Sequence, residues 1–230
     1  MQLTEEVFES RTLASKAAAV RIRDALARDL AAQDDTAMIV SGGATPEECY
    51  AWLSNTYLAW ERIHILLSDE RCVEASDPAS NEGMIRSSLL TNHATGGKLL
   101  SVFEEGLSPT EQCLALSQQI RKLPLPFSIS LLGMGEDGHF ASLFPGFDRL
   151  EEGLDPDSAI RCMPIKTAAS PHPRITLTMS TITQSQEILL LFFGIAKRDV
   201  FEQAKLPDSM YPVSALLHQD RTPVHIIWAP

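Results

Sequence analysis

The sequence predicts an α/β fold in which a mostly parallel sheet carries helices on both faces. Short apolar runs rich in Ile, Leu and Val recur along the chain, and segments with apolar residues at helical spacing lie between them. Strands that alternate with helices in this way form parallel sheets that are covered on both sides. The chain has 230 residues, a length that doubly wound sheets commonly reach as one unit, so we expect a single domain over residues 1–230.

The expected elements follow from local patterns. Residues 5–32 carry apolar side chains at helical spacing among charges, which predicts a long amphipathic helix. Apolar runs predict strands at 37–40, 62–67, 127–132, 187–193 and 224–228. Helical patterns lie between these strands, at 46–58, 81–90, 110–123, 197–204 and 213–219.

Two later stretches are less regular. Residues 145–173 hold five prolines and many acids, which predicts an irregular excursion over the surface. Residues 174–182 alternate Thr and Ile as a strand does, but their length and position also suit the start of a helix. The sequence leaves this second stretch open between strand and helix.

The bulk composition argues against several classes of protein. The formal net charge of −11 argues against a nucleic-acid partner, because binding to a phosphate backbone needs a basic face. No apolar run approaches the roughly 18–20 residues of a membrane helix, and residues 1–20 lack the basic start and apolar core of a signal peptide. We therefore expect a cytoplasmic protein without a membrane partner. No surplus apolar element stands out, which favours a monomer or a weak homo-oligomer.

The four cysteines show no pattern of a metal site or a disulfide framework. They are scattered along the chain without a CxxC pair, at Cys49, Cys72, Cys113 and Cys162. We expect them to be reduced and mostly buried.

The residues that follow each predicted strand are the first candidates for a site, because ligands of open α/β sheets bind beyond the carboxyl ends of the strands. After the first strand comes SGGATPEE. Gly42 and Gly43 permit close backbone approach, and Thr45 and Glu48 fit a capping box around a helix that begins at the proline between them. A strand, a glycine turn and a helix N-terminus form an anion cradle, although a well-capped turn without a ligand has the same pattern. The segment matches neither GxGxxG nor the P-loop, which argues against a dinucleotide or ATP.

SDERCV follows the second predicted strand. Asp69, Glu70 and Arg71 fit a solvated turn, which is the common setting for such a tripeptide, but their place at a carboxyl end also fits a role in a site. The DPASN segment behind them predicts a helix N-cap at Ser80 or Asn81.

The strongest signal follows the third predicted strand, where GMGEDGH places Glu136, Asp137 and His139 on a glycine loop. The pKa of histidine lies nearest neutrality, and a neighbouring carboxylate orients the ring and stabilises its protonated form. The pattern predicts His139 as a general base with Asp137 as its partner, against the alternative of an exposed histidine in a polar turn. No second His or Cys lies at a ligand spacing, so we expect no metal here.

Two further cations lie next to apolar runs. GIAKRD places Lys197 at the start of a helix, where a lysine works against the helix dipole unless an anion shares the space. Arg174 precedes the apolar run in PHPRITLT. Each alone would be an ordinary surface charge. Together with Arg71, the glycine turn and His139, they indicate one crevice for a phosphorylated small molecule whose far end meets a general base.

These motifs resemble those of a known family. SGGATP, SDERCV with DPASN behind it, LLGMGEDGHFASLFPG, PHPRITLT and GIAK occur here in the order seen in 6-phosphogluconolactonases, relatives of the glucosamine-6-phosphate deaminase/isomerases. The likeness runs from about residue 37 to 200, and the GMGEDGH…ASLFPG block is highly specific. It implies a Rossmann-like fold, no metal or cofactor, and hydrolysis of 6-phospho-D-glucono-1,5-lactone to 6-phosphogluconate in the pentose phosphate pathway.

The resemblance also implies roles for the residues around the lactone. His139 would activate water, with Asp137 as its close acidic partner. Arg71 would lie beside the lactone or the phosphate, and Asp69 near the sugar hydroxyls.

At the phosphate, the resemblance implies that Arg174 and Lys197 neutralise the charge. The turn that wraps the phosphate would consist of Gly42, Gly43, Ala44 and Thr45. Two residues depart from the family pattern. Ala44 replaces the usual serine and removes one hydroxyl donor, and Phe140 replaces a frequent threonine, which changes the packing below His139.

Two other functions are weighed against the lactonase. An aminosugar-6-phosphate isomerase/deaminase resembles this chain but carries an acid beyond the DGH histidine and an aromatic residue after the earlier acidic pair. Here Leu143 and Phe144 occupy the first neighbourhood and Arg71 the second. A phosphosugar-binding sensor without catalysis usually carries a further domain, for which a chain of this length has no room. The lactonase is therefore the favoured function.

Overall fold

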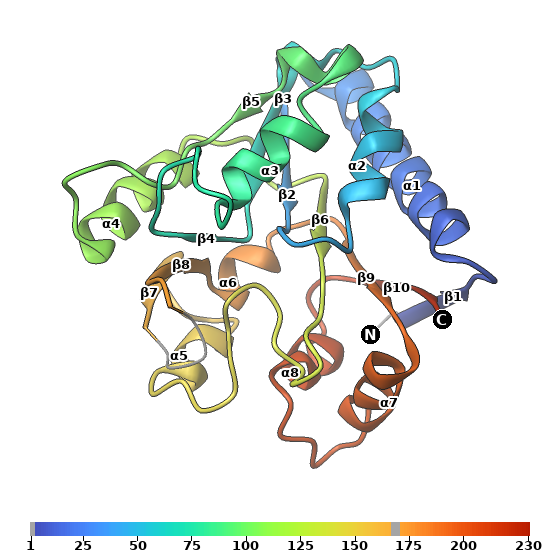
Figure 1. The fold of residues 1–230 in the computed structure, drawn as a ribbon, viewed down its shortest axis with the longest axis vertical. Coiled ribbons are helices and arrows are strands. Elements are labelled where there is room, and N and C mark those ends of the chain that lie inside the picture. Colours follow the sequence, from blue (N-terminus) through green and yellow to red (C-terminus); the bar gives the residue numbers. More distant parts are fainter. Residues whose placement is uncertain (1–2, 167–170) are drawn as a thin grey trace.

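The computed structural model describes residues 3–166 and 171–230. In this part of the chain the main sheet has seven strands, all parallel, in the order β1-β10-β9-β6-β2-β3-β5 (Figure 1). The strands are β1 (Leu3–Val7), β10 (Val224–Ala229), β9 (Ile188–Phe193), β6 (Ile129–Leu132), β2 (Thr36–Val40), β3 (Ile63–Leu67) and β5 (Lys98–Leu99). All five predicted strands are present.

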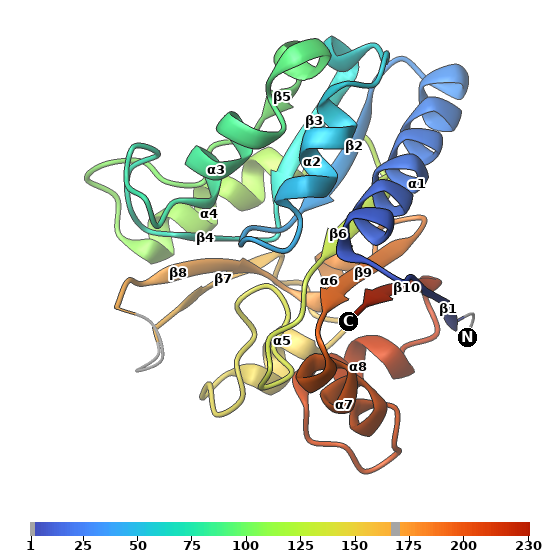
Figure 2. The ribbon, with the colours of Figure 1, turned by 45° about the vertical axis from the view of Figure 1, so that its right-hand side comes forward.

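The crossover connections place helices on both faces of this sheet. The helices are α1 (Arg11–Ala32), α2 (Glu47–Ser54), α3 (Asn81–Ser88), α4 (Pro109–Ile120), α5 (Leu150–Leu154), α6 (Met179–Ile182), α7 (Ile195–Ala204) and α8 (Pro212–His218). Short 3₁₀ turns lie at Trp60–Arg62 and Asn92–Gly96. The connections that lead from β1 through β2 and β3 to β5 carry α1, α2 and α3, which lie side by side (Figure 2). From β5 the chain returns across the sheet to β6, β9 and β10, and these connections carry the later helices. Because such crossovers are right-handed, the two sets cover opposite faces, which confirms the predicted α/β architecture.

The central strands are buried along their whole length. Every residue of β2 and of β6 is buried, as expected where helices cover both faces of a parallel sheet. The core continues into the helices through Phe201 of α7, whose ring centroid lies 5.4 Å from that of Phe192 in β9. The four cysteines are free, and of these only Cys72 is more than slightly exposed.

The first predicted helix is shorter than expected, because Leu3–Val7 forms strand β1 instead. β1 lies at the edge of the sheet and pairs in parallel with β10, so most of its side chains are exposed and its apolar pattern is weak. The helix α1 begins at Arg11, where the Ser10 hydroxyl accepts a hydrogen bond from the Leu13 amide and acts as N-cap. The prediction of a helix over 5–32 was therefore wrong at its N-terminal end.

A second, antiparallel sheet was not predicted. It has the order β4-β8-β7 and is formed by β4 (Asp69–Arg71), β8 (Arg174–Leu177) and β7 (Cys162–Ile165). Residues 145–173, predicted as an irregular excursion, therefore contain the helix α5 and the strand β7. Residues 167–170 of this stretch lie outside the described residues. β4 and β7 were not predicted, because each has only three or four residues and β4 pairs with a segment distant in sequence. The stretch 174–182, left open before, is a strand followed by the short helix α6.

The helix N-termini near the sheet edge differ from each other. Ser80 caps α3 as predicted, and its hydroxyl accepts from the Gly83 amide at 3.1 Å. The capping box predicted for α2 is absent, because the chain already has helical angles at Pro46 (φ −86°, ψ −5°) and no side chain caps that helix. Thr45 lies in the preceding turn.

The packing of Phe201 against β9 generates a prediction about the free energy of unfolding. Phe201→Ala should lower the free energy of unfolding by about 3–5 kcal/mol, because the fully buried ring leaves a cavity against β9. Urea denaturation measures the loss. Tyr57→Ala is the matched control, since that ring is 85% exposed and its removal should change stability by less than about 0.5 kcal/mol. Equal losses for both variants would contradict this assignment of the core.

Candidate active site

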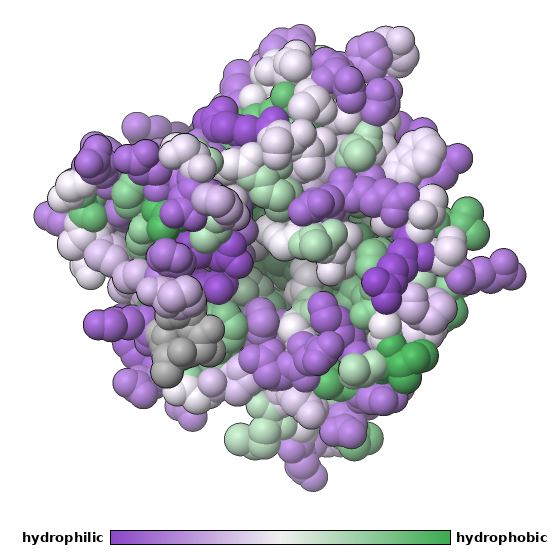
Figure 3. All heavy atoms as spheres, viewed as in Figure 1, coloured by the Kyte–Doolittle hydropathy of each residue, from purple (hydrophilic) through white to green (hydrophobic). Residues whose placement is uncertain are grey.

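A cavity of about 380 Å³ lies where the segments after β2, β3, β6 and β9 come together. Figure 3 shows the molecule hollowed near the middle of the face on which these segments meet in Figure 1. The cavity is lined by Ser41, Gly42, Gly43, Ala44, Thr45, Asp69, Arg71, Asn81, Gly133, Met134, Gly135, His139, Ala141, Arg174 and Lys197. All the predicted binding residues are therefore brought together with His139. Asp137 lies behind His139 and does not line this cavity.

His139 is oriented by Asp137 and by the glycine beneath its ring. The Nδ1 atom of His139 lies 2.5 Å from Oδ1 of Asp137, and the same carboxylate oxygen accepts a hydrogen bond from the His139 amide at 3.2 Å. A side chain at Gly135 would overlap the His139 ring, and Gly138 has a positive φ of 75°. The loop needs these glycines because the imidazole packs directly against its backbone. With Nδ1 bonded to a carboxylate, Nε2 is the nitrogen left to accept a proton.

Phe144 contacts both His139 and Arg174. The ring centroids of His139 and Phe144 are 4.3 Å apart, and the Arg174 Cζ atom lies 5.2 Å from the Phe144 centroid. An aromatic ring therefore occupies the neighbourhood in which the isomerases were expected to carry an acid. Phe140, which with Ala44 departs from the family pattern, is fully buried and belongs to the hydrophobic core.

The antiparallel pairing of β4 and β8 sets two arginines beside each other. Arg71 and Arg174 are register partners, and like charges in this position repel unless an opposite charge is near. Arg174 Nη1 lies 3.6 Å from Oδ2 of the buried Asp69. Arg71 donates from Nη1 to the Ala79 carbonyl, while its buried Nε has no partner among the described residues. Burial lowers the pKa of Arg174, and Asp69 opposes that shift.

Glu70 does not face the cavity and instead holds α3 in place. Its carboxylate accepts hydrogen bonds from the amides of Arg71 (2.6 Å), Asn81 (2.8 Å) and Glu82 (2.6 Å) and from the Ser80 hydroxyl (3.0 Å). Burial raises the pKa of Glu70, and these donated hydrogen bonds oppose the rise. The DER tripeptide is thus a short buried strand with a helix-capping carboxylate, and the solvated turn considered from sequence is wrong.

The glycine turn is shaped by Asn81. The Asn81 carboxamide donates to the Asp69 carbonyl at 2.8 Å, and a side chain at Gly42 would overlap that carboxamide. Gly43 has a positive φ of 85°. The hydroxyl of Ser41, which lines the cavity, is buried without a hydrogen-bond partner in the part of the chain that the structure describes. Such an orphaned polar atom fits a site that is completed by a polar ligand.

Lys197 reaches the cavity from α7. It is the third residue of that helix, which follows Gly194 at the end of β9, as the GIAKRD segment predicted. Burial lowers the pKa of Lys197, and the negative charge of Glu136 opposes this. Among residues 3–166 and 171–230, no group of three or more His, Cys, Asp or Glu side chains is placed to hold a metal ion, and no helix is long and apolar enough to cross a membrane.

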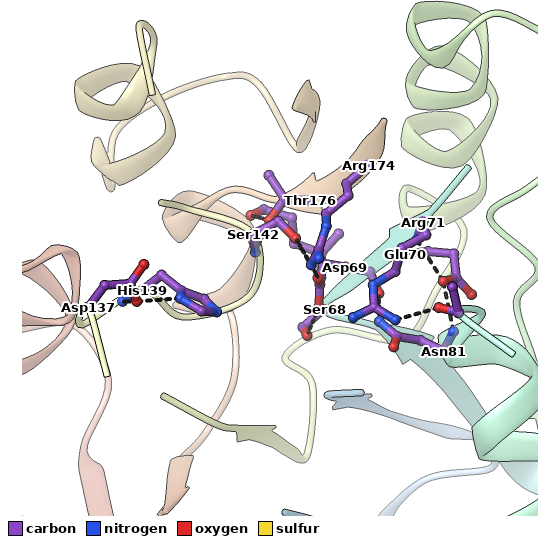
Figure 4. A network of polar contacts seen from close by, with 12 residues as sticks. Ser68, Asp69, Glu70, Arg71, Asn81, Asp137, His139, Ser142, Arg174 and Thr176 are labelled. Carbon is purple, nitrogen blue, oxygen red and sulfur yellow. Dashed lines mark hydrogen bonds and ion pairs between the residues drawn. The ribbon is translucent and has the colours of Figure 1, made fainter. Parts of the chain in front are cut away.

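Three contributors to the site were not assigned a site role from sequence. Asn81 was considered only as a helix cap, and Glu70 was weighed between a turn and a site without being given a role. Ser142 was not considered, although it lies in the ASLFPG block that follows the histidine. Its hydroxyl donates to Asp69 Oδ2 and accepts from Arg174 (Figure 4). Such roles arise from contacts between distant segments, and only Ser142 lies in a block whose specificity pointed toward the site.

The fold and the cavity define an α/β protein with a cationic, glycine-lined cavity at the carboxyl edge of its sheet. The chain belongs to the glucosamine-6-phosphate isomerases/6-phosphogluconolactonase family, whose model matches residues 9–228.

Individual relatives agree over nearly the full length. A 6-phosphogluconolactonase of Mesorhizobium japonicum is 37% identical over 223 residues, which cover 97% of this chain and 94% of that protein. Another, from Caulobacter vibrioides, is 36% identical over 226 residues, with 97% and 96% covered. The crystal structure of a 6-phosphogluconolactonase from Shewanella baltica matches with a TM-score of 0.95 at 32% identity and covers 100% of this chain and 98% of that one.

The contact between the glycine turn and α3 generates a stability prediction. Gly42→Ala should lower the free energy of unfolding by about 1–3 kcal/mol, because its Cβ overlaps the Asn81 carboxamide. Urea denaturation measures the effect. To check that the overlap is the cause, Gly42→Ala is also introduced into a protein that carries Asn81→Gly and therefore lacks the carboxamide. In that protein, Gly42→Ala should cost much less stability than it costs in the wild type. An undiminished cost there would contradict the overlap as its source.

Proposed function

We propose that this chain hydrolyses 6-phospho-D-glucono-1,5-lactone to 6-phospho-D-gluconate. The observation that carries the proposal is the placement of His139, bonded through Nδ1 to Asp137, in the same cavity as the glycine turn, two arginines and a lysine. The family membership and the names of the full-length relatives support the same reaction.

In the proposed mechanism, Nε2 of His139 takes a proton from water as the water oxygen bonds to C1 of the lactone. Asp137 holds the ring and stabilises the imidazolium that forms. The tetrahedral oxyanion then collapses, the bond between C1 and the ring oxygen breaks, and that oxygen receives the proton from His139. The result is the open-chain acid, whose carboxyl group loses its proton to solvent. General-base assistance of this kind contributes about 10²- to 10⁴-fold, which suits a lactone that already hydrolyses in water.

The phosphate is assigned to the glycine turn and the surrounding cations. The Gly42–Thr45 turn supplies close backbone approach, and Lys197 and Arg174 supply positive charge. Ala44 offers no hydroxyl, but the buried, unpartnered hydroxyl of Ser41 offers a donor on the same turn. Asp69 and Arg71 line the remaining wall and are assigned to the sugar ring and its reacting end.

The aminosugar isomerase fits the same cavity less well. Moving a proton between C1 and C2 needs a carboxylate free to act as base. Among the described lining residues only Asp69 carries a carboxylate, and it is already engaged by Ser68, Ser142 and Arg174. A binding protein without catalysis would not need the Asp137–His139 pair. Release of ammonia from glucosamine 6-phosphate would favour the isomerase over our proposal.

His139→Ala should lower kcat by about 10²- to 10⁴-fold and leave the dissociation constant of 6-phosphogluconate nearly unchanged, because it removes the base but not the phosphate contacts. The measurement is hydrolysis of freshly prepared lactone coupled to 6-phosphogluconate dehydrogenase, corrected for the spontaneous rate. His93→Ala is the control, since that histidine packs against Tyr57 outside the cavity. Unchanged turnover in His139→Ala would remove this residue from the mechanism, and a wild type no faster than the spontaneous reaction would overturn the proposed function.

Lys197→Ala should raise KM about tenfold or more with little change in kcat, because the ammonium binds the phosphate in both ground and transition state. Its protonation gives a sharper test. The ammonium is charged below its pKa, and burial lowers that pKa from 10.5, so affinity for 6-phosphogluconate should fall as pH rises toward 10.5. In Lys197→Arg, the guanidinium stays charged and the affinity should hold over the same range. Calorimetric titrations that show parallel pH profiles for the two proteins would exclude Lys197 as the titrating group.

A further inference from the structure

The hydroxyl of Ser142 lies between an acidic and a basic residue of the cavity wall. Ser142 is fully buried and does not itself line the cavity. Its Oγ donates to Oδ2 of Asp69 and accepts from Nη1 of Arg174 at 3.3 Å (Figure 4). The direct approach of Arg174 Nη1 to Asp69 Oδ2 is 3.6 Å, which is longer than a hydrogen bond. The serine hydroxyl therefore bridges the two side chains.

The backbone of Ser142 is fixed to the same strand that carries Arg174. Its amide donates to the Thr176 hydroxyl at 3.1 Å, and Thr176 is two residues beyond Arg174 in β8 and the register partner of Asp69. The residue before it, Ala141, has a positive φ of 49°, a conformation that a non-glycine residue holds only where its surroundings impose it. The loop that begins with His139 is thus anchored to β8 at the position where the hydroxyl meets Arg174.

We propose that Ser142 is a positioning residue, which aims the Arg174 guanidinium at the substrate anion and fixes its distance from the loop of His139. The inference rests on the proposed function in one respect, the assignment of Arg174 to the anion. Because Ser142 does not line the cavity, it acts on the ligand through the two lining side chains that it bonds, Asp69 and Arg174. The proposal assigns its effect on anion binding to Arg174. Without the hydroxyl, the bridge between Asp69 and Arg174 is lost, and we expect the guanidinium to shift from the position that it now holds 3.6 Å from Asp69.

Ser142→Ala should therefore raise KM for the lactone and the dissociation constant of 6-phosphogluconate by the same factor, about tenfold, the effect of one hydrogen bond to a charged group. The value of kcat and its pH profile should stay unchanged, because His139 and Asp137 keep their contacts. Ser130→Ala is the matched control. Ser130 is also fully buried and bonds through its hydroxyl to Ser185 at 2.6 Å, in strand β6 away from the cavity lining. Ser130→Ala should lower the thermal stability without changing the affinity for 6-phosphogluconate.

A double-mutant cycle tests whether the effect passes through Arg174. Affinity for 6-phosphogluconate is measured by calorimetry for wild type, Ser142→Ala, Arg174→Ala and the double variant. We expect Arg174→Ala to weaken binding and the addition of Ser142→Ala to weaken it no further, within about twofold. Full additivity, or an affinity in Ser142→Ala within twofold of wild type, would overturn the inference.

The binding measurements keep this inference separable from the proposed function, because they need no turnover. If Arg174→Ala binds 6-phosphogluconate as well as wild type while the wild type hydrolyses the lactone, the positioning role is wrong and the proposed function stands. If the wild type binds 6-phosphogluconate but does not hydrolyse the lactone, the proposed function is wrong, and the cycle still decides the role of Ser142. If the wild type neither binds 6-phosphogluconate nor hydrolyses the lactone, both are wrong.

Discussion

The cavity depends on a carboxylate that does not line it. Glu70 lies in β4, where the chain has left the parallel sheet after β3 and pairs with β8. Its carboxylate accepts four hydrogen bonds, one from the amide of the next residue in β4 and three from the start of α3. A buried carboxylate needs such compensation, since an unpaired one would cost several kcal/mol. By holding α3, Glu70 places Asn81 against Gly42 and Asp69. One buried acid thus sets the position of the turn after β2 relative to the strand after β3.

Much of the fold could be predicted because its central strands are buried on both faces and are read directly as apolar runs. β1 was missed because an edge strand with exposed side chains carries little apolar pattern. β7 was missed because it contains a proline and lies in a segment rich in prolines and acids, a composition that suggests a loop. The site residues that interrupt a structural pattern were predictable, above all His139 on its glycine loop. Glu70 and Ser142 were not, because an acid that caps a distant helix and a serine that bridges two segments look like ordinary loop residues until those segments meet.

An aromatic side chain contacts both the proposed base and one of the cations. Phe144 packs against the ring of His139 and against the guanidinium of Arg174, and Phe140 fills the core from the same loop. One aromatic side chain thus packs against both the proposed base and one of the cations of the cavity. An acid in its place would serve a different reaction, in which a carboxylate moves the proton.

The charges of the cavity are opposite to those of the molecule as a whole. The chain has a formal net charge of −11, so its long-range field repels a phosphorylated substrate. Attraction must come at short range, where Arg71 and Arg174 lie in register and Lys197 is half-buried, all three at a cost in repulsion or lost hydration. Under the proposed function, a dianionic phosphate offsets that cost, while a neutral sugar does not. Selectivity for a phosphorylated ligand would then derive from cations that are unfavourable until the anion binds, and the net negative charge would weaken only its long-range approach.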